Sequence, residues 1–184
     1  LTYDEPCLAR EVVPAAAGLL NCSNAVSGDL TNATVNGYAS CSVNKDLWYS
    51  FTATNMTHQI RVTGNGDFKP SVTLYNTGVC SSLGTGYLQC VSSDDPGGTA
   101  TITRRNLEIG GRYYLKISYA GITEPASQTF DICILTPVND EPCNAIEVTP
   151  TAPGVSVCTN PVNGDVQVAS FNNLVTCTSN NPDV

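Results

Sequence analysis

The sequence is poor in basic residues and has no long apolar segment. Its 184 residues include eight Lys and Arg against sixteen Asp and Glu, which gives a net charge of −8. Because a chain this acidic repels nucleic acid and anionic membrane surfaces, we expect neither as a partner. No apolar run approaches the length of a membrane span, so we also expect no membrane insertion.

Histidine and tryptophan each occur only once. Any Ser-His-Asp site would have to use His58, but this residue shares strand parity with Ile60 and Val62 and is expected to be a packed or capping imidazole. Trp48 is out of phase with Leu47, so two placements stay open: on a solvent-facing surface, where it could stack on a sugar, or under a loop. We predict no catalytic residues and therefore no enzyme.

In contrast, the sequence contains nine cysteines, a high number for its length. Zinc binding is one use of clustered cysteines, but the sequence contains no CxxC pair and its one histidine is far from paired cysteines. An even number of cysteines per module at repeated spacings instead favours disulfides formed in an oxidising compartment. We therefore predict a protein that is secreted or exposed at the cell surface.

The sequence also repeats itself. Residues 4–41 match residues 140–177 without a gap, beginning with DEPC in both copies, and Cys7, Cys22 and Cys41 fall on Cys143, Cys158 and Cys177. A shared period as long as a domain indicates tandem domains. We predict a complete module over residues 3–137, a linker at 138–139, and the N-terminal third of a second copy over 140–184.

A third of a β-domain cannot bury a core by itself. Two explanations stay open, and we favour the first. The residues are a piece of a longer array, or a neighbouring subunit completes the second copy with its own strands and so forms a head-to-tail polymer. Under both explanations the expected partners are neighbouring copies of the module.

Short segments rich in Val, Ile, Thr, Tyr and Phe alternate with clusters of Gly, Asn, Pro and Ser. Period two is clear where Tyr113, Leu115, Ile117 and Tyr119 share one face. We expect strands at residues 46–54, 58–64, 71–76, 86–93, 99–104, 112–120 and 129–136. Seven short strands with frequent turns predict an all-β fold, an antiparallel β-sandwich of jelly-roll type. Gly110 and Gly111 are expected to supply the positive φ of a tight turn into the 112–120 strand.

Six cysteines in one module allow many pairings, and the sequence alone does not select one. Chain proximity favours Cys80–Cys90, which would close a short excursion between two strands, and Cys22–Cys41, which would recur as Cys158–Cys177. Cys7–Cys133 would then clamp the two ends of the module together. A bridge across so long a loop is worth about 4–5 kcal/mol on a chain-entropy estimate.

Calcium is the one metal for which the sequence offers ligands. Asp94 and Asp95 are adjacent in the loop SSDDPGG, and GNGDF at Gly64–Phe68 offers further oxygens on another turn. Calcium takes six to eight oxygen ligands from loops of this composition. The alternative is that Asp, Asn and Gly are here as ordinary turn residues. No cofactor is required for either interpretation.

Several segments resemble one known family. DEPCLAREVVP, DLWYSFTA, THQIRVTG, NLEIGGRYYLKISYAG and TFDICI are similar, in this order, to the pre-peptidase C-terminal-like β-sandwich modules of large extracellular Bacteroidota proteins, many of them exported by type IX secretion. The resemblance implies a repeated, non-catalytic accessory, adhesive or stalk module outside the cell. The partial second copy adds a fibre as one possible assembly of this structural or adhesive module. The alternative function is that of a carbohydrate- or receptor-binding accessory module of a secreted enzyme.

Overall fold

A computed structural model describes residues 2–19, 21–76, 78–83, 86–138, 145–150, 152–154 and 161. The predicted Cys158–Cys177 bridge, the start of the second copy at Asp140 and most of residues 140–184 lie outside these ranges. The described strands are β1 (Arg10–Glu11), β2 (Val26–Asp29), β3 (Asp46–Thr52), β4 (His58–Gly64), β5 (Pro70–Tyr75), β6 (Gln89–Ser92), β7 (Thr99–Arg104), β8 (Arg112–Tyr119) and β9 (Thr129–Leu135). Two 3-10 turns, η1 (Pro6–Leu8) and η2 (Cys80–Ser82), complete the elements.

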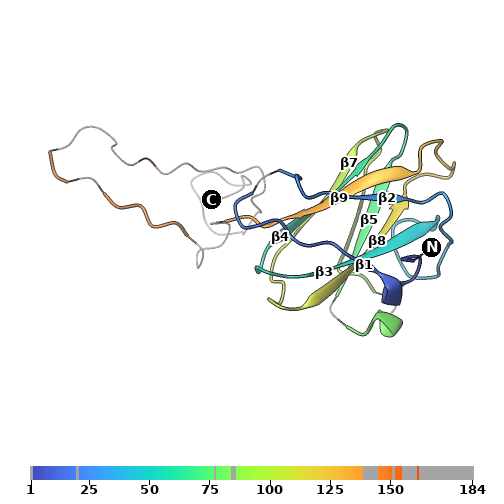
Figure 1. Cartoon of the computed structure of the whole chain (residues 1–184), viewed down its shortest axis with the longest axis horizontal. Helices are drawn as coiled ribbons and strands as arrows, with labels where there is room; N and C mark the ends of the chain where they lie inside the picture. Colours follow the sequence, from blue (N-terminus) through green and yellow to red (C-terminus); the bar gives the residue numbers. More distant parts are fainter. Residues whose placement is uncertain are drawn as a thin grey trace.

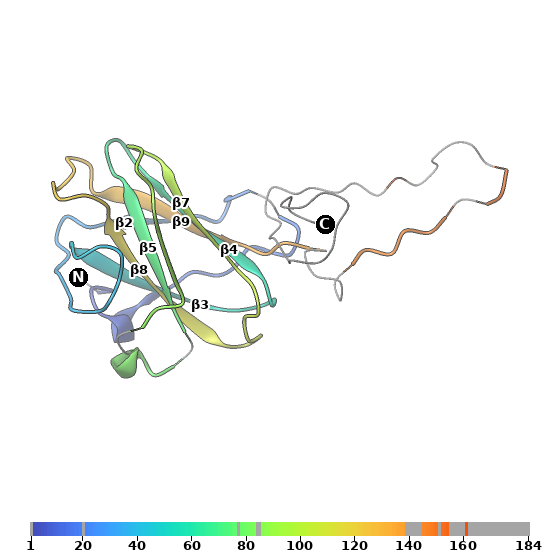
Figure 2. The same ribbon diagram turned by 180° about the vertical axis from the view of Figure 1, so that it is seen from behind.

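The strands form two facing sheets, as Figures 1 and 2 show from opposite sides. One sheet has the order β1-β3-β8-β5-β6 and the other the order β2-β9-β4-β7. All pairings are antiparallel except that of β1 with β3. The predicted all-β sandwich is therefore confirmed, and within the described residues no helix is long and apolar enough to cross a membrane.

The core lies between the sheets because each central strand presents alternate apolar residues to the other sheet. The predicted face of β8 is confirmed, since Tyr113, Leu115, Ile117 and Tyr119 all belong to the main buried cluster. Gly110 has a φ of +83° at the start of β8, as expected, whereas Gly111, for which a positive φ was also expected, does not have one. Among the described residues, the buried apolar core residues other than proline lie between Val12 and Leu135.

A glycine in β2 sets the distance between the sheets at one edge. A Cβ atom added to Gly28 would lie 2.3 Å from the Tyr49 hydroxyl and 2.4 Å from the Phe130 ring. No other residue fits without moving these two aromatic side chains. The same glycine recurs as Gly164 in the repeat.

The chain enters the sandwich at one end, which we name the leading end, and leaves it at the opposite end, the trailing end. At the leading end, the backbone N–H of Trp48, near the start of β3, donates to Tyr3 O at 2.8 Å. At the trailing end, Asn55, which follows β3, donates its side-chain amide to Pro137 O at 3.4 Å. Figure 1 shows the N-terminus and the segment after β9 on opposite sides of the sandwich.

The residues after β1 connect the two sheets. Val12 N donates to Ser50 O of β3 at 2.8 Å, and Ala15 N donates to Ile134 O of β9 at 2.7 Å. Gly18 N then donates to Thr136 O at 3.0 Å. The segment therefore crosses from β1, at the edge of one sheet, to the C-terminal end of β9 in the other sheet.

Candidate functional site

The predicted calcium loop lies at the leading end, between β6 and β7. Asp94 and Asp95 are both exposed. Asp95 N donates to Ser93 Oγ at 3.3 Å, and Gly98 N donates to Asp95 O at 3.0 Å. These bonds close a tight turn in which Ser, Asp and Gly each have an ordinary structural use.

The second predicted group of oxygens, in the loop between β4 and β5, is brought beside this turn. Gly97 N donates to Phe68 O at 3.0 Å, which joins the two loops. However, the Asp67 carboxylate already accepts bonds from Ser127 N at 2.7 Å and Ala126 N at 2.8 Å. These backbone donors hold the pKa of Asp67 below its usual range. Asp67 therefore anchors the loop before β9.

Within the described residues, no group of three His, Cys, Asp or Glu side chains is arranged to hold a metal ion. Asp94 and Asp95 are the carboxylates that would contribute to such a site, and calcium binding stays a prediction.

A shallow hollow of about 370 Å³ opens beside these loops. It is lined by charged and apolar residues together, among them Asp67, Lys69, Ile122 and Glu124. Ile122 is fully exposed. The Glu124 carboxylate is 2.5 Å from Lys45 Nζ, and this contact lowers its pKa. An open surface of this composition is suited to contact with another macromolecule, because it does not enclose a small reactant.

A second hollow, of about 460 Å³, lies on the outer face of the β2-β9-β4-β7 sheet. Its lining includes Gln59, Arg61, Thr63 and Thr99. Arg61 Nε donates to Gln59 Oε1 at 2.5 Å, and the hydroxyls of Thr63 and Thr99 are 2.9 Å apart. The face is a row of amide, hydroxyl and guanidinium groups, which suits a hydroxyl-rich ligand.

His58 is a structural residue. Its imidazole is fully buried, and Nε2 accepts bonds from the backbone N–H groups of Thr54 at 3.0 Å and Asn55 at 3.2 Å. Nδ1 lies 3.2 Å from Leu135 O. Burial lowers the pKa of His58. The neutral ring therefore caps the turn after β3 and fastens it to the end of β9, as the expected capping imidazole would.

Trp48 lies under a loop, which decides between the two placements that the sequence left open. It is fully buried on the outer face of β3. Its ring packs edge-on against Tyr38, with 5.1 Å between centroids, and lies 5.2 Å from the Tyr75 ring. Trp48 is therefore not an exposed platform for stacking on a sugar.

The disulfides join Cys7 to Cys80, Cys22 to Cys133 and Cys41 to Cys90. All six cysteines of the module are bonded, but the predicted pairs Cys80–Cys90, Cys22–Cys41 and Cys7–Cys133 are wrong. Those pairs assumed that cysteines close along the chain are close in space. Instead η2, with Cys80, packs against η1, and the loop before β3 crosses the outer face of β6 at Cys90.

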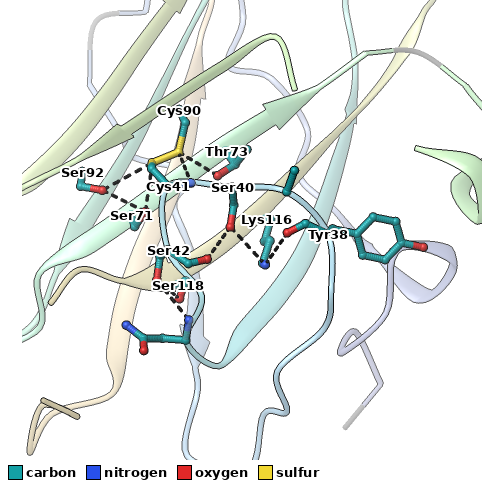
Figure 3. Close-up of a disulfide and its surroundings, with 12 residues drawn as sticks. Tyr38, Ser40, Cys41, Ser42, Ser71, Thr73, Cys90, Ser92, Lys116 and Ser118 are labelled. Carbon is teal, nitrogen blue, oxygen red and sulfur yellow. Dashed lines mark hydrogen bonds between the residues drawn. A yellow bond between two sulfur atoms is a disulfide. The ribbon is translucent and has the colours of Figure 1, made fainter. Parts of the chain in front are cut away.

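Figure 3 shows the surroundings of the Cys41–Cys90 disulfide. Cys90 Sγ lies 3.0 Å from the Thr73 hydroxyl of β5, while Cys41 Sγ lies 3.5 Å from the Ser71 hydroxyl. The bridge therefore pins the loop between β2 and β3 onto a polar part of the outer sheet face.

A buried ion pair lies beneath the same loop. Lys116 Nζ is 3.3 Å from Asp46 Oδ2, and both side chains are almost fully buried. Lys116 also donates to Tyr38 O and to Ser40 Oγ, each at 3.2 Å. Burial raises the pKa of Asp46 to about 6, although Lys116 opposes this rise. Neither residue was predicted from the sequence, in which the only signal is a lysine among aromatic residues in the 112–120 strand.

Comparison with known proteins assigns the family. Residues 4–134 match the galactose binding domain-like family associated with type IX secretion. The chain therefore belongs to this family, and the resemblance to secreted modules of pre-peptidase C-terminal type is confirmed. None of the curated proteins matches the chain.

Solved structures give more distant likenesses. The pre-peptidase C-terminal domain of a collagenase from Bacillus anthracis is 13% identical over 68% of this chain and 93% of that chain, with a TM-score of 0.41. A periplasmic inhibitor of g-type lysozyme from Aeromonas hydrophila is 10% identical over 67% and 98%, with a TM-score of 0.34. The carbohydrate-binding module CBM36, in complex with calcium and xylotriose, is 16% identical over 59% and 97%, with a TM-score of 0.29. At such low scores the ligands of these proteins are not assigned to this chain.

The association with type IX secretion and the three disulfides indicate an extracellular protein. Membership of this family indicates that the chain is an accessory module.

Proposed function

We propose that this chain is a load-bearing structural module of a long extracellular protein, with no catalytic role of its own. The observation that carries the proposal is the Cys22–Cys133 disulfide. Cys22 is in the segment between β1 and β2 that crosses from one sheet to the other, and Cys133 is in β9, the strand from which the chain leaves. Tension applied along the polypeptide therefore passes through this bond and bypasses the strands between the two cysteines.

The other two disulfides support the same proposal. Cys7–Cys80 ties the first turn of the module to the turn after β5, and Cys41–Cys90 ties the loop before β3 to β6. Each fastens an irregular segment to a part of the sandwich far away in sequence. Segments of this kind are the first to separate from a β-sandwich because they make few backbone hydrogen bonds.

The repeat supports a tandem arrangement, in which a second module begins at Asp140. Residues shared by the two copies have structural roles in the first. The Asp4 carboxylate accepts bonds from Thr34 N at 2.8 Å and Thr34 Oγ1 at 2.6 Å, and Ser170 occupies the position that corresponds to Thr34. Because the chain enters and leaves at opposite ends, successive modules would follow one another in a line.

Stretching single molecules tests this proposal. With the disulfides formed, a module held at Tyr3 and Pro137 should lengthen only by the residues outside the Cys22–Cys133 loop. Extension of the whole module without reductant would contradict the proposal.

The second candidate function is recognition of a glycan, which would make the module an adhesive or carbohydrate-binding one. The row of hydroxyl, amide and guanidinium groups on β4 and β7 favours it, together with membership of a galactose binding domain-like family. A glycan array probed with the module and with an Arg61→Ala variant tests it. Binding that depends on Arg61 would support this function, and no binding to any glycan would refute it.

A further inference from the structure

The trailing end of the sandwich carries a group of exposed apolar side chains, which we name the trailing-end surface. Its members are Leu19, Met56, Ile109 and Val138, which are exposed to 47%, 38%, 62% and 39%. They come from four separate segments of the chain. Large apolar side chains that gather on one surface indicate a contact with another macromolecule more often than single exposed ones do.

The four segments touch one another. Figures 1 and 2 both show them at the side of the sandwich from which the chain leaves. Three contacts join them in order: Val138 Cγ1 is 3.6 Å from the position of a Cβ on Gly18, Asn55 Nδ2 donates to Pro137 O at 3.4 Å, and Leu107 N donates to Met56 O at 2.9 Å. The four segments that carry the trailing-end surface are therefore neighbours in space.

The sequence indicates what covers this surface. Val138 belongs to it, and only Asn139 separates Val138 from Asp140, the first residue of the repeated motif. In the first module the equivalent Asp4 is fixed by its two bonds to Thr34. Two consecutive Cα–Cα steps span at most about 7.6 Å. A module that begins at Asp140 therefore starts beside the surface.

We propose that the trailing-end surface is the docking surface for the leading end of the module that follows it in the same chain. The proposal rests on the tandem arrangement proposed above. The leading end offers apolar side chains of its own, since Val43 is 83% exposed and Ile122 is fully exposed. Contact between the two ends would bury apolar area on both modules and restrict their relative motion.

The single methionine of the chain makes this contact measurable, because Met56 lies within the surface. The test protein has residues 3–139 followed by a second copy of residues 4–138. Each copy contains its own core and all three disulfides, so each is a complete folding unit. The first Met56 would be covered by the second module, and the second Met56 would stay free.

Oxidation of methionine by dilute peroxide, followed by mass spectrometry, should then show two phases of equal amplitude. The fast phase should match that of an isolated module, and the slow phase should be severalfold slower. Ile109→Asp in the first module should merge the two phases into the fast one. Val79→Asp is the matched control, because Val79 is 66% exposed but adjoins Cys80, which is bonded to Cys7 near the start of the module. It should leave both phases unchanged.

A single fast phase in the unsubstituted two-module protein would overturn the proposal, as would two phases that Ile109→Asp leaves unchanged. Slow oxidation in the isolated module that depends on concentration would identify a second molecule as the occupant and would also overturn it. The Ile109→Asp variant is used only when the isolated variant module unfolds at the same temperature as the isolated unsubstituted module. When it does not, the proposal is decided by comparing Met56 oxidation in the unsubstituted two-module protein with that in the unsubstituted isolated module. A single fast phase together with a short extension under force would reject the docking alone and leave the load-bearing function standing.

Discussion

The Cys22–Cys133 disulfide should limit how far the module can be stretched. The two cysteines are 111 positions apart in the sequence. At about 3.5 Å per extended residue, the disulfide withholds about 390 Å of chain from the path of the force. Only the residues before Cys22 and after Cys133 stay free to extend, and together they amount to roughly 80 Å when fully drawn out.

The assay is force spectroscopy on a tandem protein pulled through its two ends, with and without a reductant that reaches the disulfides. We expect a contour-length gain of at most about 80 Å per module before reduction and an additional gain of about 390 Å per module after it. Replacing Cys22 and Cys133 together by Ser should give an intermediate additional gain of about 130 Å without reductant, because the Cys7–Cys80 disulfide still withholds the residues between its two cysteines.

The matched control replaces Cys41 and Cys90 together by Ser. This second disulfide lies within the loop that Cys22–Cys133 closes, so its loss should weaken the module without changing the contour-length gain. Full extension of the unsubstituted, oxidised module would refute the reasoning. So would a longer gain in the Cys41/Cys90 variant, because the loop would then not be shielded.

Three further predictions concern stability and calcium. Gly28→Ala should lower the free energy of unfolding by about 1–3 kcal/mol, because its Cβ would overlap the Tyr49 hydroxyl and the Phe130 ring. Gly37→Ala, where no atom lies within 4 Å of the added Cβ, should stay near neutral in the same denaturant titration. Burial raises the pKa of Asp46 from 3.8 to about 6, so between these pH values the folded protein holds a proton there that the unfolded chain releases. The resulting stabilisation should be complete below pH 3.8 and lost as the pH rises through about 6. Denaturant titrations at several pH values should show this loss as roughly 2–3 kcal/mol, and Asp46→Asn should abolish it. If Asp94 and Asp95 bind calcium, calorimetry should detect binding that the double Asn variant loses, and no heat of binding in the unsubstituted protein would reject the calcium site.

The sequence was sufficient for the fold because the long strands follow period two. The segments around Tyr113 and Ile60 alternate apolar and polar residues, and the turns between them contain Gly, Asn and Pro. The strands β1 and β2 were not among the predicted strands. They are two and four residues long, and β2 is mostly polar. Such short strands are formed by their partners in the sheet and not by their own composition.

The disulfide pairs could not be predicted because they depend on how separate elements are arranged in space. Cys80 and Cys90 are ten positions apart, yet the first bonds to a turn near the N-terminus and the second to the loop before β3. The burial of the Lys116–Asp46 pair could not be predicted either, because it also depends on how separate elements are arranged in space. Nothing in the 112–120 strand indicates that a loop from residues 30–45 will cover its outer face.

The central claim is that the chain is one unit of a load-bearing extracellular array. The most direct test is to isolate the native protein from the outside of the cells, determine its mass, and view it by electron microscopy. We predict a mass of several modules and a beaded, extended particle with disulfide-bonded beads in a line. A compact particle with a mass near 19.3 kDa would contradict the account.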